Sequence, residues 1–290
     1  MSKEVQYFAP KTLEDALQIL KEQGDGVSIM AGGTDLVRDM NLEFKIPDGI
    51  LWVGHLGLEY IKTGTDTIRI GAATRMQTAA GSKILKETAA ALAYSAGKMA
   101  SPPVRSLATL GGNLVNASPG ADTACAMLGL DGEVVLKSAS GERVVSLLEF
   151  FTGPNTTVIK PDELMTEIRI RPTGKSEGSS YLKIGRRKAM TLAVLNTTSR
   201  VKLNGNGNCE EVFIAVGAAA PTPLRITKAE KLLTGQAFTE EAILEAADIA
   251  AEEIKPIDDV HGTAWYRRKV ARVLVEQTLR AAGGLNGGTK

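Results

Sequence analysis

The chain has 290 residues, of which 43% are hydrophobic and 23% charged, and its formal net charge is +1. This composition is typical of soluble globular proteins, and the length suits two domains better than one compact core. The balanced charge gives no overall reason to expect nucleic acid or an anionic membrane surface as a partner.

The few cysteines and histidines exclude several kinds of metal centre. Cys125 and Cys209 cannot supply four thiolates for an all-cysteine iron–sulfur cluster or zinc site. They are also too few for a disulfide framework, which indicates a reducing compartment. His55 and His261 lie far apart and lack the spacing of an HExxH motif. We therefore expect no metal on this chain.

No targeting or membrane-spanning segment is visible in the sequence. The first residues, 1–4, contain no apolar stretch of the kind found in secretory signals. No run approaches the roughly 18 apolar residues that a membrane helix needs. We therefore expect a cytoplasmic protein.

Helix, strand and turn patterns alternate through the first part of the chain. Thr12 is a good helix N-cap, apolar residues follow it at helical spacing, and Gly24 can end that helix. The alanine-rich stretch 84–96 also predicts a helix. Strands are predicted at the apolar runs 27–31, 50–53 and 67–71. The alternation continues to about residue 170 and indicates an α+β or α/β region.

The segment 172–180, rich in Gly, Pro and Ser, marks the best domain boundary. An Asn/Gly turn at 204–208 predicts a hairpin in the region that follows. Strands are predicted there at 181–184, 193–203 and 211–219, and helices at 227–233, 239–253 and 263–281. A three-stranded sheet followed by three helices forms a self-contained second domain.

Neither GxGxxG nor GxxxxGK[ST] occurs, so an ordinary Rossmann or P-loop site has no support. Two other segments pair glycines with small polar residues: AGGTDL at 31–36 and TLGGNLVNASP at 109–119. Backbone N–H groups with no side chain in the way can hold a diphosphate without a lysine. Side chains able to donate to phosphate oxygens are Thr34, Thr109, Asn113 and Asn116.

The same residues also have simpler explanations. Ionised Asp35 and Asp122 cannot donate, and we expect them to cap a turn or to accept from a ribose or a ring N–H. A glycine pair after a strand is usually only a turn, and the basic run at 183–188 is typical of a solvated face. From physical chemistry alone, a diphosphate cradle and a pair of simple turns both stay open.

The two segments resemble the two FAD-binding motifs of the FAD subunit, or medium subunit, of molybdenum hydroxylases, the family of xanthine dehydrogenase and carbon monoxide dehydrogenase. The resemblance covers nearly the whole chain and includes the opening residues 7–10. It implies an α+β fold in which residues 1–175, subdivided near 55–65, form a two-part FAD-binding domain of the PCMH/vanillyl-alcohol-oxidase type. Residues 176–290 would form a C-terminal flavoprotein domain with a three-stranded antiparallel sheet and a three-helix bundle.

The resemblance also implies which residues bind FAD. Asp122 matches the family's acidic FAD ligand, and Lys183 matches a second-domain lysine that reaches the flavin. The positions matching the first loop around the diphosphate are Ala31, Gly32, Gly33, Thr34, Asp35 and Leu36. Those matching the second loop are Thr109, Gly111, Gly112, Asn113 and Asn116.

Four further positions match residues near the flavin ring. Met99 and Ala100 match a segment beside the flavin. Leu164 matches an apolar residue that supports the cofactor, and Leu192 matches the one that covers a face of the isoalloxazine. Thr191 departs from the pattern, because many relatives carry Asp there, and this affects the flavin potential and the electron acceptor more than FAD binding.

Two other features have a simple and a sharper explanation. The stretch 101–105, with two prolines, restricts the backbone before the second motif, either as a rigid loop or to place Met99 and Ala100 against the flavin. Cys125 is most simply a small buried hydrophobic residue. We expect no catalytic residue on this chain, because no acid–base pair of its own is evident.

The function implied by the resemblance is a xanthine dehydrogenase-like oxidoreductase subunit that transfers electrons. Substrate would be hydroxylated at a molybdenum cofactor on a large partner subunit. Electrons would pass through [2Fe–2S] clusters on a small partner subunit to FAD on this chain, and then to NAD+ or another acceptor. A dimer of heterotrimers is implied as well.

Two other functions stay open. A stand-alone flavin oxidoreductase of the same superfamily needs its own substrate pocket and proton donor, and turnover by the isolated chain would favour it. A non-catalytic scaffold predicts no flavin, and the intact glycine pairs argue against it. The substrate of the molybdenum subunit and the physiological electron acceptor are open too.

Overall fold

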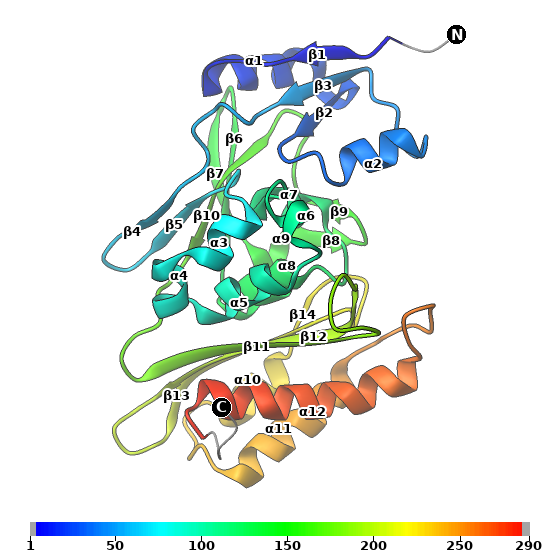
Figure 1. The fold of residues 1–290 in the computed structure, drawn as a ribbon. Helices are drawn as coiled ribbons and strands as arrows, with labels where there is room; N and C mark the ends of the chain where they lie inside the picture. Colours follow the sequence, from blue (N-terminus) through cyan, green and yellow to red (C-terminus); the bar gives the residue numbers. More distant parts are fainter. Residues whose placement is uncertain (1–3, 286–290) are drawn as a thin grey trace.

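The computed structural model describes residues 4–285, which form three parts stacked along one direction (Figure 1). The N-terminal part holds a three-stranded sheet, the middle part a five-stranded sheet with most of the short helices, and the C-terminal part a four-stranded sheet followed by three helices. The predicted α+β fold class is confirmed. Each part has its own buried apolar cluster.

The N-terminal part is a small parallel sheet in the order β1–β3–β2. Helix α1 (Leu13–Gln23) begins at Thr12, whose hydroxyl accepts a 3.1 Å hydrogen bond from the Asp15 N–H, and ends at Gly24, as predicted. The strands are β1 (Gln6–Phe8), β2 (Val27–Met30) and β3 (Gly49–Trp52). A 3-10 turn, η1 (Gly24–Gly26), precedes β2, and helix α2 (Leu36–Asn41) follows it.

The middle part is an antiparallel sheet in the order β4–β5–β10–β6–β7. Its strands are β4 (Ile61–Thr63), β5 (Ile68–Gly71), β6 (Glu133–Ser138), β7 (Gly141–Ser146) and β10 (Leu164–Ile170). Its helices are α3 (Met76–Gly81), α4 (Lys83–Thr88), α5 (Ala90–Lys98), α6 (Pro102–Arg105), α7 (Leu110–Asn116), α8 (Asp122–Gly129) and α9 (Leu147–Phe150). A separate hairpin joins β8 (Phe151–Gly153) and β9 (Thr156–Thr157).

The helix predicted over 84–96 is two helices rather than one. Ala89, with φ −155° and ψ 52°, separates α4 from α5. Alanine is the best helix former, so propensity gives no sign of this break. Ala89 is fully buried in the middle core, and packing there turns the chain.

The C-terminal part is an antiparallel sheet in the order β11–β12–β13–β14. Its strands are β11 (Glu177–Gly185), β12 (Ala193–Leu203), β13 (Cys209–Gly217) and β14 (Leu224–Arg225). The prediction had three strands. The fourth is only two residues long and follows Pro221 and Pro223, which lack the N–H that a sheet ladder needs. Leu224 and Arg225 keep theirs and pair with Val216 and Ala215.

Three helices cover the face of this sheet that points away from the middle part (Figure 1). They are α10 (Thr227–Leu233), α11 (Glu240–Glu253) and α12 (Ala264–Ala282), close to their predicted bounds. The side chains of β12 alternate accordingly. Leu195 and Val201 belong to the apolar core with these helices, whereas Asn196, Thr198 and Arg200 contact residues of the middle part.

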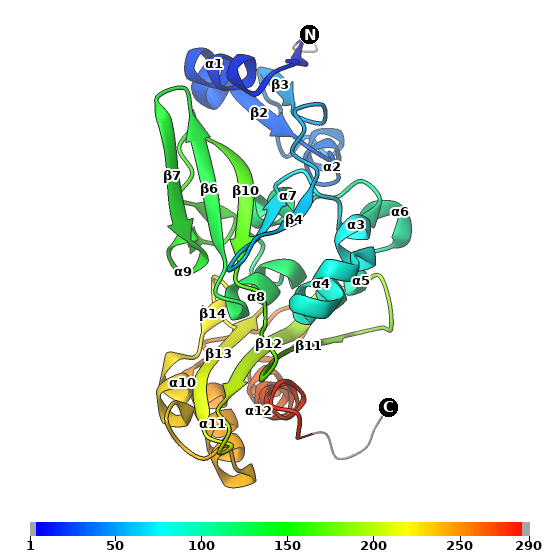
Figure 2. The same cartoon turned by 90° about the vertical axis from the view of Figure 1, so that its left-hand side faces the viewer.

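Helix α8 lies between the middle part and the C-terminal sheet, and all eight of its residues are buried (Figure 2). Its last residue, Gly129, is needed for this close packing. A Cβ there would lie 2.6 Å from the Thr198 side chain of β12. Any larger residue would therefore push the helix away from the strand.

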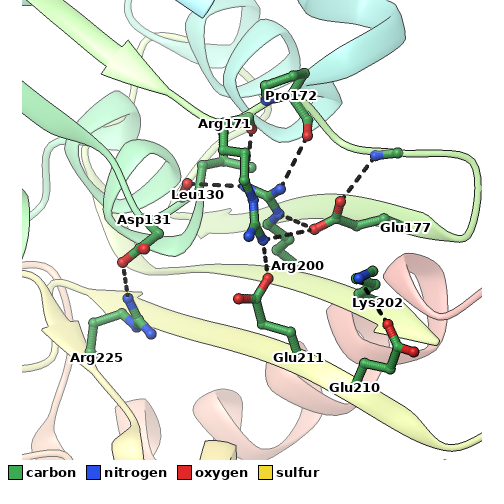
Figure 3. A network of polar contacts seen from close by, with 11 residues as sticks. Leu130, Asp131, Arg171, Pro172, Glu177, Arg200, Lys202, Glu210, Glu211 and Arg225 are labelled. Atoms are coloured by element: carbon green, nitrogen blue, oxygen red, sulfur yellow. Dashed lines mark hydrogen bonds and ion pairs between the residues drawn. The ribbon is translucent and has the colours of Figure 1, made fainter. Parts of the chain in front are cut away.

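A buried arginine holds the middle and C-terminal parts together (Figure 3). The Arg200 side chain is 1% exposed. Its guanidinium donates to the carbonyls of Leu130, Arg171 and Pro172 at 3.3, 3.0 and 3.2 Å, and its Nε donates to Glu177 Oε1 at 2.5 Å. One planar group thus satisfies acceptors from the end of α8, the end of β10 and the start of β11.

Arg200 also keeps the carboxylate of Glu177 ionised. Burial alone would raise the pKa of Glu177, but hydrogen bonds from Arg200 and from the Gly174 N–H outweigh it and hold that pKa below its usual value. The two buried charges therefore depend on each other.

We predict that Arg200→Met lowers the free energy of unfolding by about 3–5 kcal/mol, because the buried Glu177 carboxylate loses its 2.5 Å partner and keeps only Arg171, which is 3.4 Å away and half-exposed. Lys202→Met is a matched control on the same strand. Lys202 pairs with Glu210 at 2.8 Å, but the two side chains are 46% and 44% exposed, so the loss there should stay below about 1 kcal/mol. Chemical denaturation of both variants measures the difference. Equal losses of unfolding free energy would show that Arg200 does not hold the middle and C-terminal parts together.

A second ionic cluster lies on the five-stranded sheet. The Glu167 side chain is 4% exposed and accepts hydrogen bonds from Tyr60 at 2.7 Å, Arg69 at 2.8 Å and Arg169 at 2.7 Å. Burial favours a higher pKa, but these donors outweigh it and lower the pKa of Glu167 to about 2. Burial, together with the bond to Glu167, raises the pKa of Tyr60 to about 12.

This depressed pKa predicts acid sensitivity with a definite sign. The contribution of Glu167 to stability is complete above its ordinary pKa of 4.5 and is lost as the pH falls from there toward 2. Glu167→Gln should be less stable than the wild type at neutral pH, and its stability should fall less steeply below pH 4.5. Unfolding curves between pH 6 and 3 test this expectation, and identical slopes for the two proteins would refute it.

Candidate functional site

The first glycine pair is fixed against the segment that leads into the second. Gly33 has φ 70°, a left-handed conformation that glycine adopts readily. A Cβ on Gly32 would lie 2.0 Å from the carbonyl oxygen of Leu107, two residues before Thr109. The structure therefore brings the two motifs together through a contact that no larger residue would permit.

The backbone amides of the first loop are free to bind a ligand. Within residues 4–285, the N–H groups of Gly32, Gly33, Thr34 and Asp35 donate to no protein acceptor. Asp35 precedes α2 without capping it, and its carboxylate lies 3.6 Å from Arg38. Consecutive amides without partners form a partly positive concavity that suits an anion.

The second glycine pair is more closed than the sequence predicts. The N–H groups of Leu110 and Gly111 donate to the carbonyls of Thr74 and Ala72 at 2.9 and 2.8 Å. The hydroxyl of Thr109 caps α7 by accepting from the Gly112 N–H at 3.1 Å. Free amides were expected at both pairs, and among the described residues only the first pair has them. Gly112 itself is exposed, but a Cβ there would lie 2.8 Å from the Thr109 hydroxyl oxygen.

Helix α7 contributes two amide side chains. The Asn113 Oδ1 accepts from the Thr123 hydroxyl at 2.6 Å, so its NH2 group has no acceptor in the described part of the chain. Asn116 lies at the end of the helix and is partly exposed. The bond to Thr123 also connects the second motif to the start of α8.

Asp122 is the centre of a buried polar network. Its Oδ2 accepts from Lys183 Nζ at 2.6 Å, and its Oδ1 accepts from Tyr181 at 2.6 Å and from Asn196 Nδ2 at 3.2 Å. Lys183 also donates to the carbonyl of Lys98 at 3.3 Å. Burial, and then the charge of Asp122, raise the pKa of Tyr181 well above its usual value, so its hydroxyl stays a donor.

The segment expected beside the flavin follows Lys98 directly. Ala100 has φ 42°, a conformation that costs an alanine roughly 1–2 kcal/mol. The guanidinium of Arg105 donates to the carbonyls of Met99 and Ala100 at 2.9 and 3.2 Å and holds this turn. The stretch 101–105 thus holds the turn at these two residues, and their placement against the flavin stays a prediction.

Two predicted apolar contacts lie in different surroundings. Leu164 is buried in the N-terminal core, against which Ala31 also packs. Leu192 lies between β11 and β12, and the residue is 59% exposed. Leu36 begins α2 and is partly buried.

Sequence reasoning missed several residues that build this site. Tyr181 and Asn196 hold Asp122, Leu107 supports Gly32, and Arg105 fixes the turn at 99–100. A signal existed for the first two. Tyr181 is two residues before Lys183 on one strand and so shares its face, and Asn196 is a polar residue inside an apolar strand.

Family models match both halves of the chain. Residues 3–173 match the FAD binding domain in molybdopterin dehydrogenase. Residues 180–282 match the CO dehydrogenase flavoprotein C-terminal domain.

Individual relatives match over almost their full length. The glyceraldehyde dehydrogenase medium chain of Sulfolobus acidocaldarius is 32% identical over 278 residues, 96% of this chain and 98% of that relative. The carbon monoxide dehydrogenase medium chain of Hydrogenophaga pseudoflava is 31% identical over 96% of each chain. A solved structure of carbon monoxide dehydrogenase from Hydrogenophaga pseudoflava has a TM-score of 0.93 at 31% identity and covers 97% of this chain and 98% of its own.

The two cysteines are buried, and burial raises the pKa of Cys125 to about 12 and that of Cys209 to about 11. Among residues 4–285, no group of three or more His, Cys, Asp or Glu residues could hold a metal ion. No helix in that range is long and apolar enough to cross a membrane.

We predict that neither thiol of the native protein reacts with iodoacetamide at pH 8. The thiolate, not the thiol, is the nucleophile, and its fraction at that pH would be about 10⁻⁴ for Cys125 and about 10⁻³ for Cys209. Mass spectrometry should find both alkylated after unfolding in guanidinium. Complete labelling of either thiol in the folded protein would contradict the burial of that cysteine.

Proposed function

The chain belongs to the family of FAD-binding subunits of molybdenum hydroxylases, and we propose that it binds FAD in the site described above and transfers electrons through it. The observation that carries this proposal is the row of four amides without partners at 32–35, fixed against the entry to the second motif. Bound FAD would supply an electron carrier that accepts electrons singly and passes on a pair.

The residues present fit an anionic dinucleotide. Four amides and the hydroxyl of Thr34 are available in the first loop, and the amide of Asn113 is available in the second motif. Gly112 is exposed, so its backbone can be approached from outside. In this proposal the two loops hold the diphosphate, and no lysine of a P-loop type is required.

The flavin ring would lie toward Lys183, Met99 and Ala100. Of the three donors of the Lys183 ammonium, the described residues use two, so one remains for the ring. Leu164 would support the cofactor from the N-terminal core and Leu192 would cover one face. In domain terms, 1–175 would hold the diphosphate and 176–290 would bring the lysine.

The electrons would come from a partner. Relatives are named medium chains, which supports a place beside a large subunit with the molybdenum cofactor and a small subunit with [2Fe–2S] clusters. The acceptor would be NAD+ or another carrier. We also propose that such heterotrimers form a dimer and that the complex has a xanthine dehydrogenase-like activity. The same proposal places the protein in the cytoplasm.

We predict that the full chain takes up about one FAD per molecule and that Gly112→Val weakens binding at least tenfold, or about 1.4 kcal/mol. The valine would project from the exposed surface of the second motif, and its Cβ, 2.8 Å from the Thr109 hydroxyl oxygen, would also disturb the cap of α7. Gly81→Val is the control, because a Cβ at Gly81, at the end of α3, meets nothing within 4 Å. The visible spectrum after desalting, with chromatography of the released cofactor, measures uptake in each protein.

Different outcomes separate the parts of this proposal. Normal FAD content in Gly112→Val would remove the second motif from the cofactor site. A colourless wild type, both alone and co-expressed with its partners, would refute FAD binding. Reduction of bound FAD only when partner subunits and substrate are added would support the electron-carrier role over a stand-alone oxidoreductase.

A further inference from the structure

The network around Asp122 contains a tyrosine to which neither the sequence motifs nor the proposed function gives a role. Given FAD binding in the proposed site, we propose that Tyr181 is a positioning residue for Lys183. Its hydroxyl, together with the amide of Asn196, fixes the Asp122 carboxylate, which in turn holds the Lys183 ammonium toward the flavin.

The carboxylate of Asp122 is fixed from two sides. Its Oδ1 accepts from Tyr181 at 2.6 Å and from Asn196 at 3.2 Å. The Asn196 amide also donates to the carbonyl of Gly120 at 3.4 Å, so two acceptors set the orientation of its NH2 group. With Oδ1 held in this way, the carboxylate cannot rotate freely, and its Oδ2 points toward Lys183.

The ammonium of Lys183 is fixed by two bonds as well. Its side chain is 8% exposed, so water does little to hold it. One donor goes to Asp122 and one to the carbonyl of Lys98, which directly precedes Met99 and Ala100. The third N–H of the Lys183 ammonium has no partner among these bonds, and it is held beside Met99 and Ala100, the segment expected at the flavin edge.

In this arrangement Asp122 acts on the cofactor site through Lys183. Three donors occupy its oxygens, and a carboxylate has about four acceptor sites, so one is left for a ribose hydroxyl or a ring N–H. The role of Asp122 as a FAD ligand, which the resemblance to the family suggested, stays a prediction. The contacts make it, in addition, the link between Tyr181 and Lys183.

A double-mutant cycle on the full-length protein tests the contacts from Tyr181 through Asp122 to Lys183. Tyr181→Phe removes only the hydroxyl and should weaken FAD binding about tenfold, because a hydrogen bond to a charged group is lost. Lys183→Met should weaken it at least as much. In the Lys183→Met background, the added Tyr181→Phe should change the dissociation constant less than about twofold, since coupled residues do not add.

The flavin midpoint potential gives a second readout that a purely structural role would not move. Lys183→Met should lower it, because a cation near the ring stabilises the reduced, more negative flavin. Tyr181→Phe should shift it in the same direction and by less. No shift in Tyr181→Phe, with a shift in Lys183→Met, would overturn the positioning role.

Tyr60→Phe is the matched control. Tyr60 also donates to a buried carboxylate, that of Glu167 at 2.7 Å, but on the five-stranded sheet. It should lower thermal stability and leave FAD affinity and potential unchanged. If Tyr181→Phe does not fold, Asn196→Ser removes the other donor to the same oxygen and is expected to act in the same direction.

The outcomes of the cycle are distinct. Additive losses from Tyr181→Phe and Lys183→Met, or an equal effect of Tyr60→Phe, would overturn this inference while the proposed function stands. A wild-type chain that takes up no FAD would refute the proposed function itself, and this inference with it.

Discussion

One buried helix, α8, sets how the middle and C-terminal parts meet. Its first residue, Asp122, is a buried anion, and the carbonyl of Leu130 at its other end receives the buried cation of Arg200. These are the signs that the helix dipole favours at each end. Because an unpaired buried charge is expensive, each end of α8 also depends on its partner from the C-terminal sheet.

Strand β12 can reach both ends because its geometry matches the helix. Asn196 and Arg200 are four residues apart on one face, about 13 Å at roughly 3.3 Å per residue. From Asp122 to Leu130 the helix rises about 12 Å at 1.5 Å per residue. In the middle, Cys125 Sγ lies 3.8 Å from the Thr198 hydroxyl. The contact of Asn196 with Asp122 and the contact of Arg200 with Leu130 therefore lie at the two ends of one helix–strand interface.

Local signals in the sequence predicted local structure correctly. Features that depend on pairing between residues far apart in the sequence could not be predicted in this way. The cap at Thr12 and the three C-terminal helices follow from residues within a few positions. Arg200 binds carbonyls from two distant segments, at Leu130 and at Arg171 and Pro172, which no pattern around it indicates. The amides at Gly111 and Leu110 likewise looked free, because their acceptors, Ala72 and Thr74, lie far away in the sequence.

The candidate site draws on all three parts of the molecule. The free amides at 32–35 follow a strand of the N-terminal sheet, Asn113 belongs to the middle part, and Lys183 comes from the C-terminal sheet. Each of these groups is held by a different apolar core. A ligand that contacts all of them binds only the assembled chain, and by mass action it stabilises that assembly. The buried charges at the ends of α8 already hold the middle and C-terminal parts together without a ligand, and they hold Lys183 beside the helix that contacts the second glycine motif.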